Sequence, residues 1–143
     1  ERLVTRLSRS QGFMGLRVLA DRNCLYRDRA RVRLEAWVVH RVFQEGEEVA
    51  RRRISPNDPE VLSAFFEFIE STRKAAVERG MRPIGGSLGG GLTEEQFNDL
   101  VDQIRTRQGE LELLAVANRD LYETSSLDVR IEVRALSEED ETE

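Results

Sequence analysis

The chain has 143 residues, 39% of them hydrophobic and 34% charged, and a formal net charge of −5 at pH 7. A chain of this length can bury a hydrophobic core of its own, and the single cysteine, Cys24, excludes an internal disulfide. No apolar run approaches the roughly 20 residues of a membrane-spanning helix. We therefore expect one α+β domain over residues 1–136, cytoplasmic and without membrane contact.

The charge is unevenly distributed along the chain. Residues 1–53 carry a net charge of +6 and residues 54–143 a net charge of −11. Arginine outnumbers lysine by 21 to 1, which reflects either the base composition of the gene or a need for fork-shaped contacts to carboxylates and phosphates. Residues 137–143 are acidic and lack apolar side chains, so we expect a disordered tail or the start of a linker.

Alternating patterns in the first 54 residues predict strands. Residues 13–20 form a short apolar run between turn-forming residues. Residues 29–43 alternate with period two, which predicts one long, half-buried strand. We expect a turn at Gly46 and a hairpin partner over 49–54. The side of the long strand predicted to face the core carries Val32, Leu34, Val38 and Val42.

Two helices are predicted next. The first covers residues 59–79, with Asp58 as its N-cap and Gly80 just beyond its end. A loop follows that contains five glycines between Gly85 and Gly91. The second helix begins at Thr93, which forms a capping box with Gln96.

The last third is less uniform. Residues 110–123 fit either a continuing helix or a strand, and we favour helix because the residue types have high helix propensity. Residues 127–135 alternate cleanly and predict a final strand. The order β-β-β-α-α-β predicts a largely antiparallel sheet of four or five strands with two main helices on one face. The predicted core comprises Val32, Leu34, Val38, Val42, Phe65, Phe66, Ile69, Phe97, Val101, Ile104, Val129, Ile131 and Val133.

Catalytic and metal-binding patterns are absent from the sequence. The chain has one histidine, His40, and one cysteine, Cys24, which are too few for a closed zinc site or a paired nucleophile and base. The glycine-rich loop fails as a phosphate cradle because Leu92 follows Gly91 where a P-loop needs lysine. We therefore predict no catalytic residue, no metal and no cofactor, and we interpret the loop as a hinge.

Arginine and aromatic residues form the most distinctive pattern. If the strand over 49–54 pairs with the long strand over 29–43, their cationic groups lie side by side with aromatic rings among them. Such a face could bind an acidic protein surface with Trp37 as anchor, or phosphates and bases of a nucleic acid. It could also be a solvated face whose charges are matched by neighbouring acidic residues. The predicted partner-binding residues are Arg29, Arg31, Arg33, Trp37, Arg41, Phe43, Arg51, Arg52 and Arg53.

These observations favour a non-enzymatic protein–protein interaction or assembly domain. We expect it to be part of a larger protein, to dock through the arginine- and tryptophan-rich strand and the long helix, and to have a protein partner or to self-associate as an oligomer. A nucleic-acid-binding domain that uses the arginine stripe is the alternative, which the net negative charge disfavours. A third hypothesis is an enzyme whose site is built from carboxylates or completed by another subunit.

Overall fold

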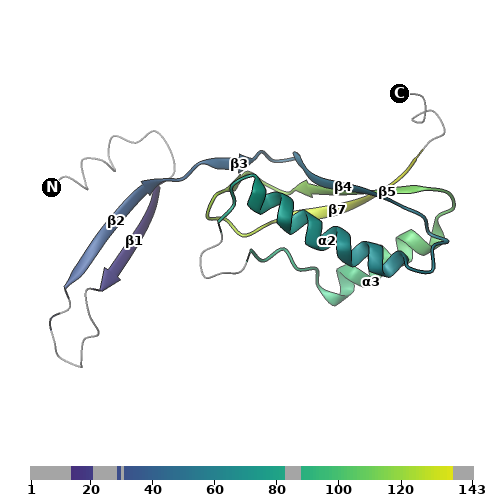
Figure 1. The fold of residues 1–143 in the computed structure, drawn as a ribbon, viewed down its shortest axis with the longest axis horizontal. Coiled ribbons are helices and arrows are strands. Elements are labelled where there is room, and N and C mark those ends of the chain that lie inside the picture. Colours follow the sequence, from purple (N-terminus) through teal and green to yellow (C-terminus); the bar gives the residue numbers. More distant parts are fainter. Residues whose placement is uncertain (1–13, 21–28, 30, 83–87, 137–143) are drawn as a thin grey trace. The chain divides into compact units, whose positions relative to one another are not determined.

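The computed structural model describes residues 14–20, 29, 31–82 and 88–136 (Figure 1). The chain divides into two compact units, residues 1–40 and 41–143, and each is described by itself. The expectation of one domain over 1–136 stays a prediction. The acidic segment 137–143 and Cys24 lie outside the described residues.

The first unit contains an antiparallel hairpin. Strand β1 (Met14–Ala20) pairs with β2 (Val32–Val38) along the whole length of both strands (Figure 1). Val18 lies opposite Leu34 near the middle of this register. The strand predicted over 13–20 is therefore confirmed over its described residues.

The second unit is a helix-backed sheet. Its elements are β3 (Arg41–Phe43), β4 (Glu48–Ile54), α2 (Val61–Glu78), α3 (Glu94–Thr106), β5 (Leu111–Ala117), β6 (Leu121–Tyr122) and β7 (Val129–Ala135). The strands form an antiparallel three-stranded sheet in the order β4-β5-β7 and an antiparallel pair β3-β6. Figure 1 shows α2 and α3 on the same side of the three-stranded sheet. The prediction of an α+β fold with antiparallel pairing and two helices is thus confirmed.

The core of the second unit has two parts. One lies between the helices and the sheet, where Phe65 and Phe68 of α2 and Ile104 of α3 pack on Leu111 and Leu113 of β5. The other lies beyond the end of α2 and is formed by Phe43, Ala76, Met81, Ala117, Leu121 and Leu127. The central strand β5 joins the two parts because Leu113 belongs to the first and Ala117 to the second.

The end of α2 and the start of α3 are both capped by local hydrogen bonds. At the end of α2, Gly80 has a φ of +118°, and its N–H and that of Met81 donate to the carbonyls of Val77 and Ala76, which is the glycine-dependent C-cap predicted from the sequence. At the start of α3, the Thr93 hydroxyl accepts from the Gln96 N–H at 3.2 Å, and the Gln96 side chain accepts from the Thr93 N–H at 3.0 Å. The predicted capping box is confirmed.

The start of α2 differs slightly from the prediction. The helix begins at Val61 with Glu60 as its N-cap, two residues later than expected. The Asp58 carboxylate accepts a hydrogen bond from the Glu60 N–H at 2.9 Å. Asp58 therefore stabilises the turn that precedes the helix rather than the first turn of the helix itself.

The structure corrects three predictions about strands. Residues 29–43 do not form one strand, since the pattern is interrupted at 39–40 between β2 and β3. The hairpin partner of β2 is β1, and β4 pairs with β5 instead. Within the described residues, the sheets therefore have two, two and three strands, whereas the sequence predicted a single sheet of four or five.

The prediction of a helix over 110–123 is wrong, because residues 111–117 form β5 and 121–122 form β6. Strand β5 is central in its sheet and is buried on both faces. Its sequence is therefore almost continuously apolar instead of alternating, and a short apolar run cannot be assigned to helix or strand by periodicity alone.

The predicted core is correct in part. Phe65, Val101, Ile104 and Val133 are buried, and Val42, Ile69, Phe97, Val129 and Ile131 are partly buried. Four predicted core residues are exposed, namely Val32, Leu34, Val38 and Phe66. The first three share one face of the hairpin and are between 45% and 57% exposed.

Candidate interaction surface

The predicted partner-binding residues fall in both units. Arg29, Arg31, Arg33 and Trp37 belong to the first unit. Arg41 and Phe43 are on β3, and Arg51, Arg52 and Arg53 are on β4, all in the second unit. Because β2 pairs with β1 and β4 with β5, the expected side-by-side register of the two arginine-rich strands is wrong.

The arginines of β4 differ in their contacts. The Arg51 guanidinium donates two hydrogen bonds of 2.6 Å to the Glu48 carboxylate and lies 3.5 Å from Glu112. Arg52 pairs with Glu67 of α2 at 2.8 Å. Arg53 is exposed and has no ion pair within the described part of the chain. Two of the three β4 arginines are thus used inside the second unit.

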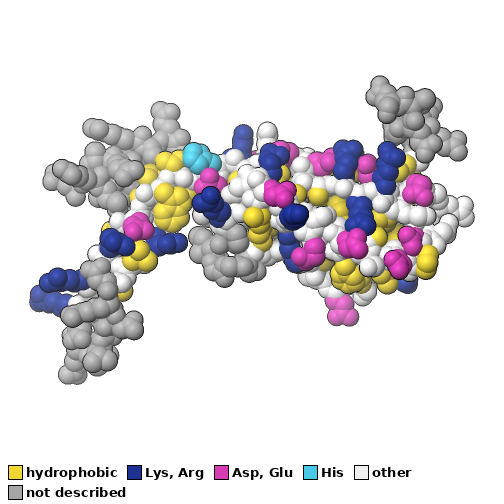
Figure 2. All heavy atoms as spheres, in the orientation of Figure 1, with side chains coloured by type: hydrophobic (Ala, Val, Ile, Leu, Met, Phe, Trp, Pro, Cys, Tyr) yellow, Lys and Arg dark blue, Asp and Glu magenta, His cyan; other side chains and the backbone are white. Residues whose placement is uncertain are grey.

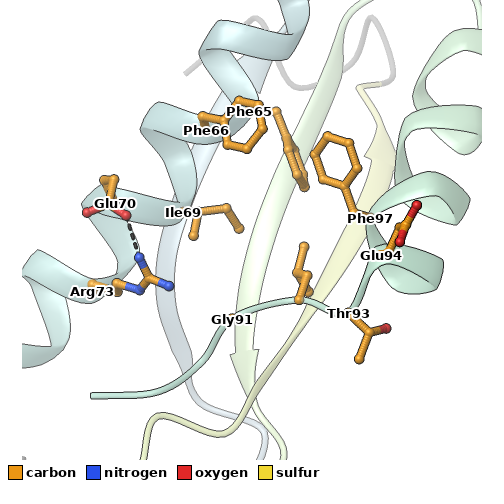
Figure 3. A pocket seen from close by; sticks show the side chains of 10 residues that line it. Phe65, Phe66, Ile69, Glu70, Arg73, Gly91, Thr93, Glu94 and Phe97 are labelled. Atoms are coloured by element: carbon orange, nitrogen blue, oxygen red, sulfur yellow. Dashed lines mark hydrogen bonds and ion pairs between the residues drawn. The ribbon is translucent and has the colours of Figure 1, made fainter. Parts of the chain in front are cut away.

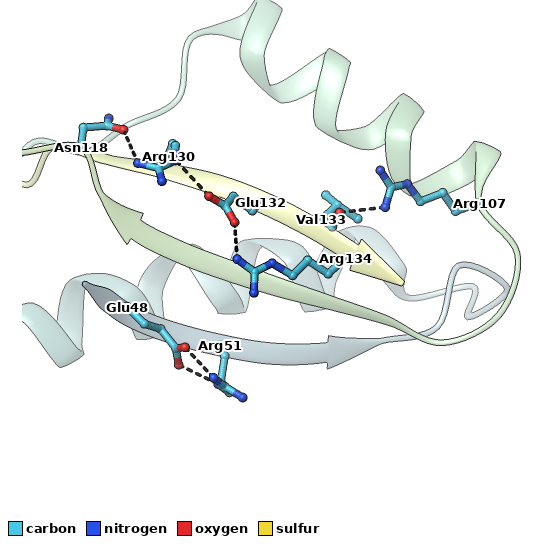
Figure 4. Close-up of polar contacts among 8 residues, drawn as sticks. All are labelled: Glu48, Arg51, Arg107, Asn118, Arg130, Glu132, Val133 and Arg134. Atoms are coloured by element: carbon cyan, nitrogen blue, oxygen red, sulfur yellow. Dashed lines mark hydrogen bonds and ion pairs between the residues drawn. The ribbon is translucent and has the colours of Figure 1, made fainter. Parts of the chain in front are cut away.

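The face of the β4-β5-β7 sheet opposite the helices is covered by ion pairs. Glu132 of β7 accepts from Arg130 at 3.0 Å and from Arg134 at 2.7 Å (Figure 4). The hydrogen bond from Arg134 is the main cause that lowers the pKa of the Glu132 carboxyl. Leu114 lies between Arg51 and Glu132 in the register and is nevertheless buried. Long charged side chains therefore shield the apolar positions of this face, which we call the charged face.

The aromatic residue of β3 is internal. Phe43 is 1% exposed, and the Arg79 guanidinium lies 4.7 Å from the centre of its ring. Arg79 also donates to Glu47 at 2.9 Å and to the Val42 carbonyl at 3.3 Å. Phe43 is therefore part of the core. The prediction that it is an accessible partner-binding residue is wrong.

One face of the hairpin combines charged residues with Trp37. The Trp37 ring is half-buried and lies directly over Gly15, its partner on β1, so that a Cβ atom on Gly15 would overlap the ring. Arg17 lies 5.9 Å from the ring centre, and Arg33 pairs with Glu35 at 3.2 Å. The described contacts of Trp37 are thus within the hairpin.

The opposite face of the hairpin is entirely apolar. Side chains alternate along a strand, so the four even-numbered residues of each strand share this face. We call it the aliphatic face, and it comprises Met14, Leu16, Val18, Ala20, Val32, Leu34, Ala36 and Val38. Five of these side chains, those of Leu16, Val18, Val32, Leu34 and Val38, are between 45% and 59% exposed. Covering their exposed halves would contribute on the order of 1 kcal/mol each.

The two units therefore present different surfaces. Figure 2 shows acidic and basic side chains interleaved over the second unit and hydrophobic side chains at the surface of the hairpin. The sequence indicated the β2 half of the aliphatic face but assigned it to the core. The alternation of Met14, Leu16, Val18 and Ala20 with Gly15, Arg17 and Leu19 is the signal that identifies the other half.

A second apolar surface lies between α2 and α3. It is a groove with a volume of about 530 Å³, and Phe65 and Phe97 face into it (Figure 3). The Phe66 ring, 57% exposed, stacks on Phe97 with ring centres 5.4 Å apart. The ion pair of Arg73 with Glu70 lies at one end of the groove. Phe66 is thus paired with another aromatic ring at the surface instead of lying in the core.

Other site types find little support in the described residues. No group of three histidine, cysteine or acidic residues that could hold a metal occurs among them, and His40 is exposed. No helix in the described ranges is long and apolar enough to cross a membrane. Comparisons of the chain with family models, with curated proteins and with solved structures find no match.

Proposed function

We propose that this chain is a non-enzymatic protein–protein interaction or assembly domain, and that the β1–β2 hairpin is its docking element. The observation that supports this proposal is the solvent exposure of the aliphatic face of the hairpin. An isolated two-stranded hairpin is only marginally stable in water. A contiguous exposed apolar surface is typical of an interaction site.

The structure of the second unit is consistent with a supporting role. Its core is packed between helices and sheet, and its charged face is occupied by internal ion pairs such as those of Arg51 and Glu132. In the first unit, by contrast, Trp37 already packs on Gly15, whereas Val18 and Leu34 are 59% and 45% exposed. We therefore place the docking contact on the aliphatic face of the hairpin. Arg33 lies on the opposite face and takes no part in this contact.

The experiment uses the two faces of β1 as matched positions. A photo-cross-linking amino acid replaces Val18 on the aliphatic face or Arg17 on the opposite face of the hairpin, and the full chain is irradiated in an extract of its native cells. We expect discrete protein adducts from position 18 and few from position 17, because position 18 lies on the face whose exposed side chains are all apolar. Absence of adducts at both positions, or equal adducts at both, would contradict the proposal.

Nucleic-acid binding is the second candidate. Arg29 and Arg31 are exposed and have no ion pair among the described residues, so they are the arginines best placed to contact phosphates. The double variant Arg29→Glu, Arg31→Glu should then abolish binding of a labelled oligonucleotide, and the affinity of the unmodified chain should fall with salt. No binding at about 50 mM salt would eliminate this candidate.

A further inference from the structure

We infer that the aliphatic face of the hairpin docks on the same face of a second copy of this chain. The inference rests on the proposed interaction function and names the partner. The geometry it implies is a two-fold pair of hairpins, stacked face to face as two layers of two strands. Most homodimers are symmetric in this way, with the same patch on both subunits.

The apolar composition of the face favours this partner. All eight positions of the aliphatic face are uncharged and apolar, so its partner must offer a surface without charges. The other uncovered sheet face in the described structure is the charged face, where ion pairs such as Arg134 with Glu132 would lose their water. The aliphatic face of a second copy meets the requirement because it has the same composition.

The polar side of the hairpin is compatible with face-to-face stacking. Arg17, Arg33 and Glu35 lie on the face away from the aliphatic one and stay in water on both outer sides of the pair. Stacked sheets are about 10 Å apart, and these side chains extend outward from both layers. The like charges of the two copies are then separated by more than the Debye length of about 8 Å at physiological ionic strength, so their repulsion is screened.

The size of the face predicts how tight the pair is. Strands of seven residues at about 3.3 Å per residue, with neighbours about 4.8 Å apart, give a sheet face of roughly 23 by 10 Å. This is smaller than the face of about 800 Å² per partner in a standard stable interface. We therefore expect a reversible dimer that dissociates on dilution through the micromolar range.

The test is sedimentation velocity of the full chain from about 1 to about 100 μM, a range that brackets a micromolar dissociation constant. The unmodified chain should form a dimer that dissociates on dilution. Leu34→Asp and Leu34→Lys should each weaken it at least tenfold, because the two-fold axis brings like charges together near the middle of the face. Mixing the two variants should restore association as a heterodimer. Phe66→Asp, on an exposed ring of the second unit, should leave the dimer unchanged.

A second measurement does not depend on disrupting the hairpin. With Cys24→Ser removing the native thiol, Val18→Cys should form a disulfide-linked dimer under mild oxidation, and Arg17→Cys on the opposite face should not. A monomeric chain at all concentrations, or a dimer that both Leu34 variants leave intact, overturns the second copy as partner. If position 18 still gives photo-adducts to another protein, the interaction function survives that result, and if it gives none, both proposals fail.

Discussion

The hairpin of the first unit and strand β5 of the second are both rich in aliphatic side chains, but they lie in opposite environments. Leu113 and Ala115 of β5 are fully buried between sheet and helices. Val18 and Leu34 of the hairpin are 59% and 45% exposed although they lie directly opposite one another. The difference shows that an apolar face in a strand does not by itself predict burial within the chain.

The strongest test of this comparison is the same leucine-to-alanine truncation in both regions. Leu113→Ala should lower the free energy of unfolding of the second unit by about 2–5 kcal/mol, because it leaves a cavity in a packed core. Leu34→Ala should change the free energy of unfolding of the first unit, to which Leu34 belongs, by less than about 0.5 kcal/mol, since its side chain is half-exposed. Urea unfolding followed by far-UV circular dichroism, at a concentration where the chain is monomeric, measures both. Equal losses would show that the hairpin face is structurally covered.

The packing of Trp37 on the hairpin can be tested through Gly15. Gly15→Ala should destabilise the hairpin by about 1–3 kcal/mol, because the added methyl group overlaps the Trp37 ring and forces it to move. Trp37 is the only tryptophan, so its fluorescence emission reports this change directly. Gly91→Ala is the control, since its added methyl group meets only the Arg73 guanidinium at 3.9 Å. An unchanged emission spectrum for Gly15→Ala would mean that the ring does not rest on β1.

A smaller effect should come from the capping box of α3. Thr93→Ala removes the hydroxyl that accepts from the Gln96 N–H, which should reduce the free energy of unfolding by about 1 kcal/mol. Thr93→Ser keeps that hydroxyl and should lose little. The comparison of the two variants by urea unfolding separates the cap from the rest of the side chain. A Ser variant as unstable as the Ala variant would assign the effect to the lost methyl group.

Local signals were the part of the fold that the sequence could predict. The capping box at Thr93 and the C-cap at Gly80 depend on side chains within a few residues of one another. The alternation over 127–135 likewise predicted β7, which covers Val129–Ala135, because one face of that strand is wet. Each of these features is decided by contacts along a short stretch of chain.

Strand partners were the part that the sequence could not predict. Arg51 was expected beside the arginines of the 29–43 segment, but its neighbour across the sheet is Leu114, more than sixty residues away. Nothing in the alternation of β4 distinguishes these two partners. The same limit explains Phe43, which alternates like a surface residue and is buried by Met81 and Leu121 in the second core cluster.

The smallest expected effect concerns the acid sensitivity of the second unit. The pKa of Glu47 lies below its ordinary value of 4.5, mainly because the Gln44 N–H donates to its carboxylate and also because Arg79 does. A carboxyl whose pKa is lowered by folding adds stability above the unfolded value, and that stability is lost as the pH falls through the folded value. Stability should therefore decline as the pH falls below about 4.5, and less steeply in Glu47→Gln.

Exposure limits the size of this effect. The Glu47 side chain is 37% exposed, so water and salt screen its pairing with Arg79, and the difference should be a few tenths of a kcal/mol. Glu45→Gln is the matched control, because its side chain forms no ion pair within the described residues of the same turn. Urea unfolding at pH 7 and pH 3 checks the prediction. If Glu45→Gln flattens the pH dependence as much as Glu47→Gln does, general charge reduction, and not the contact between the β3–β4 turn and the end of α2, is the cause.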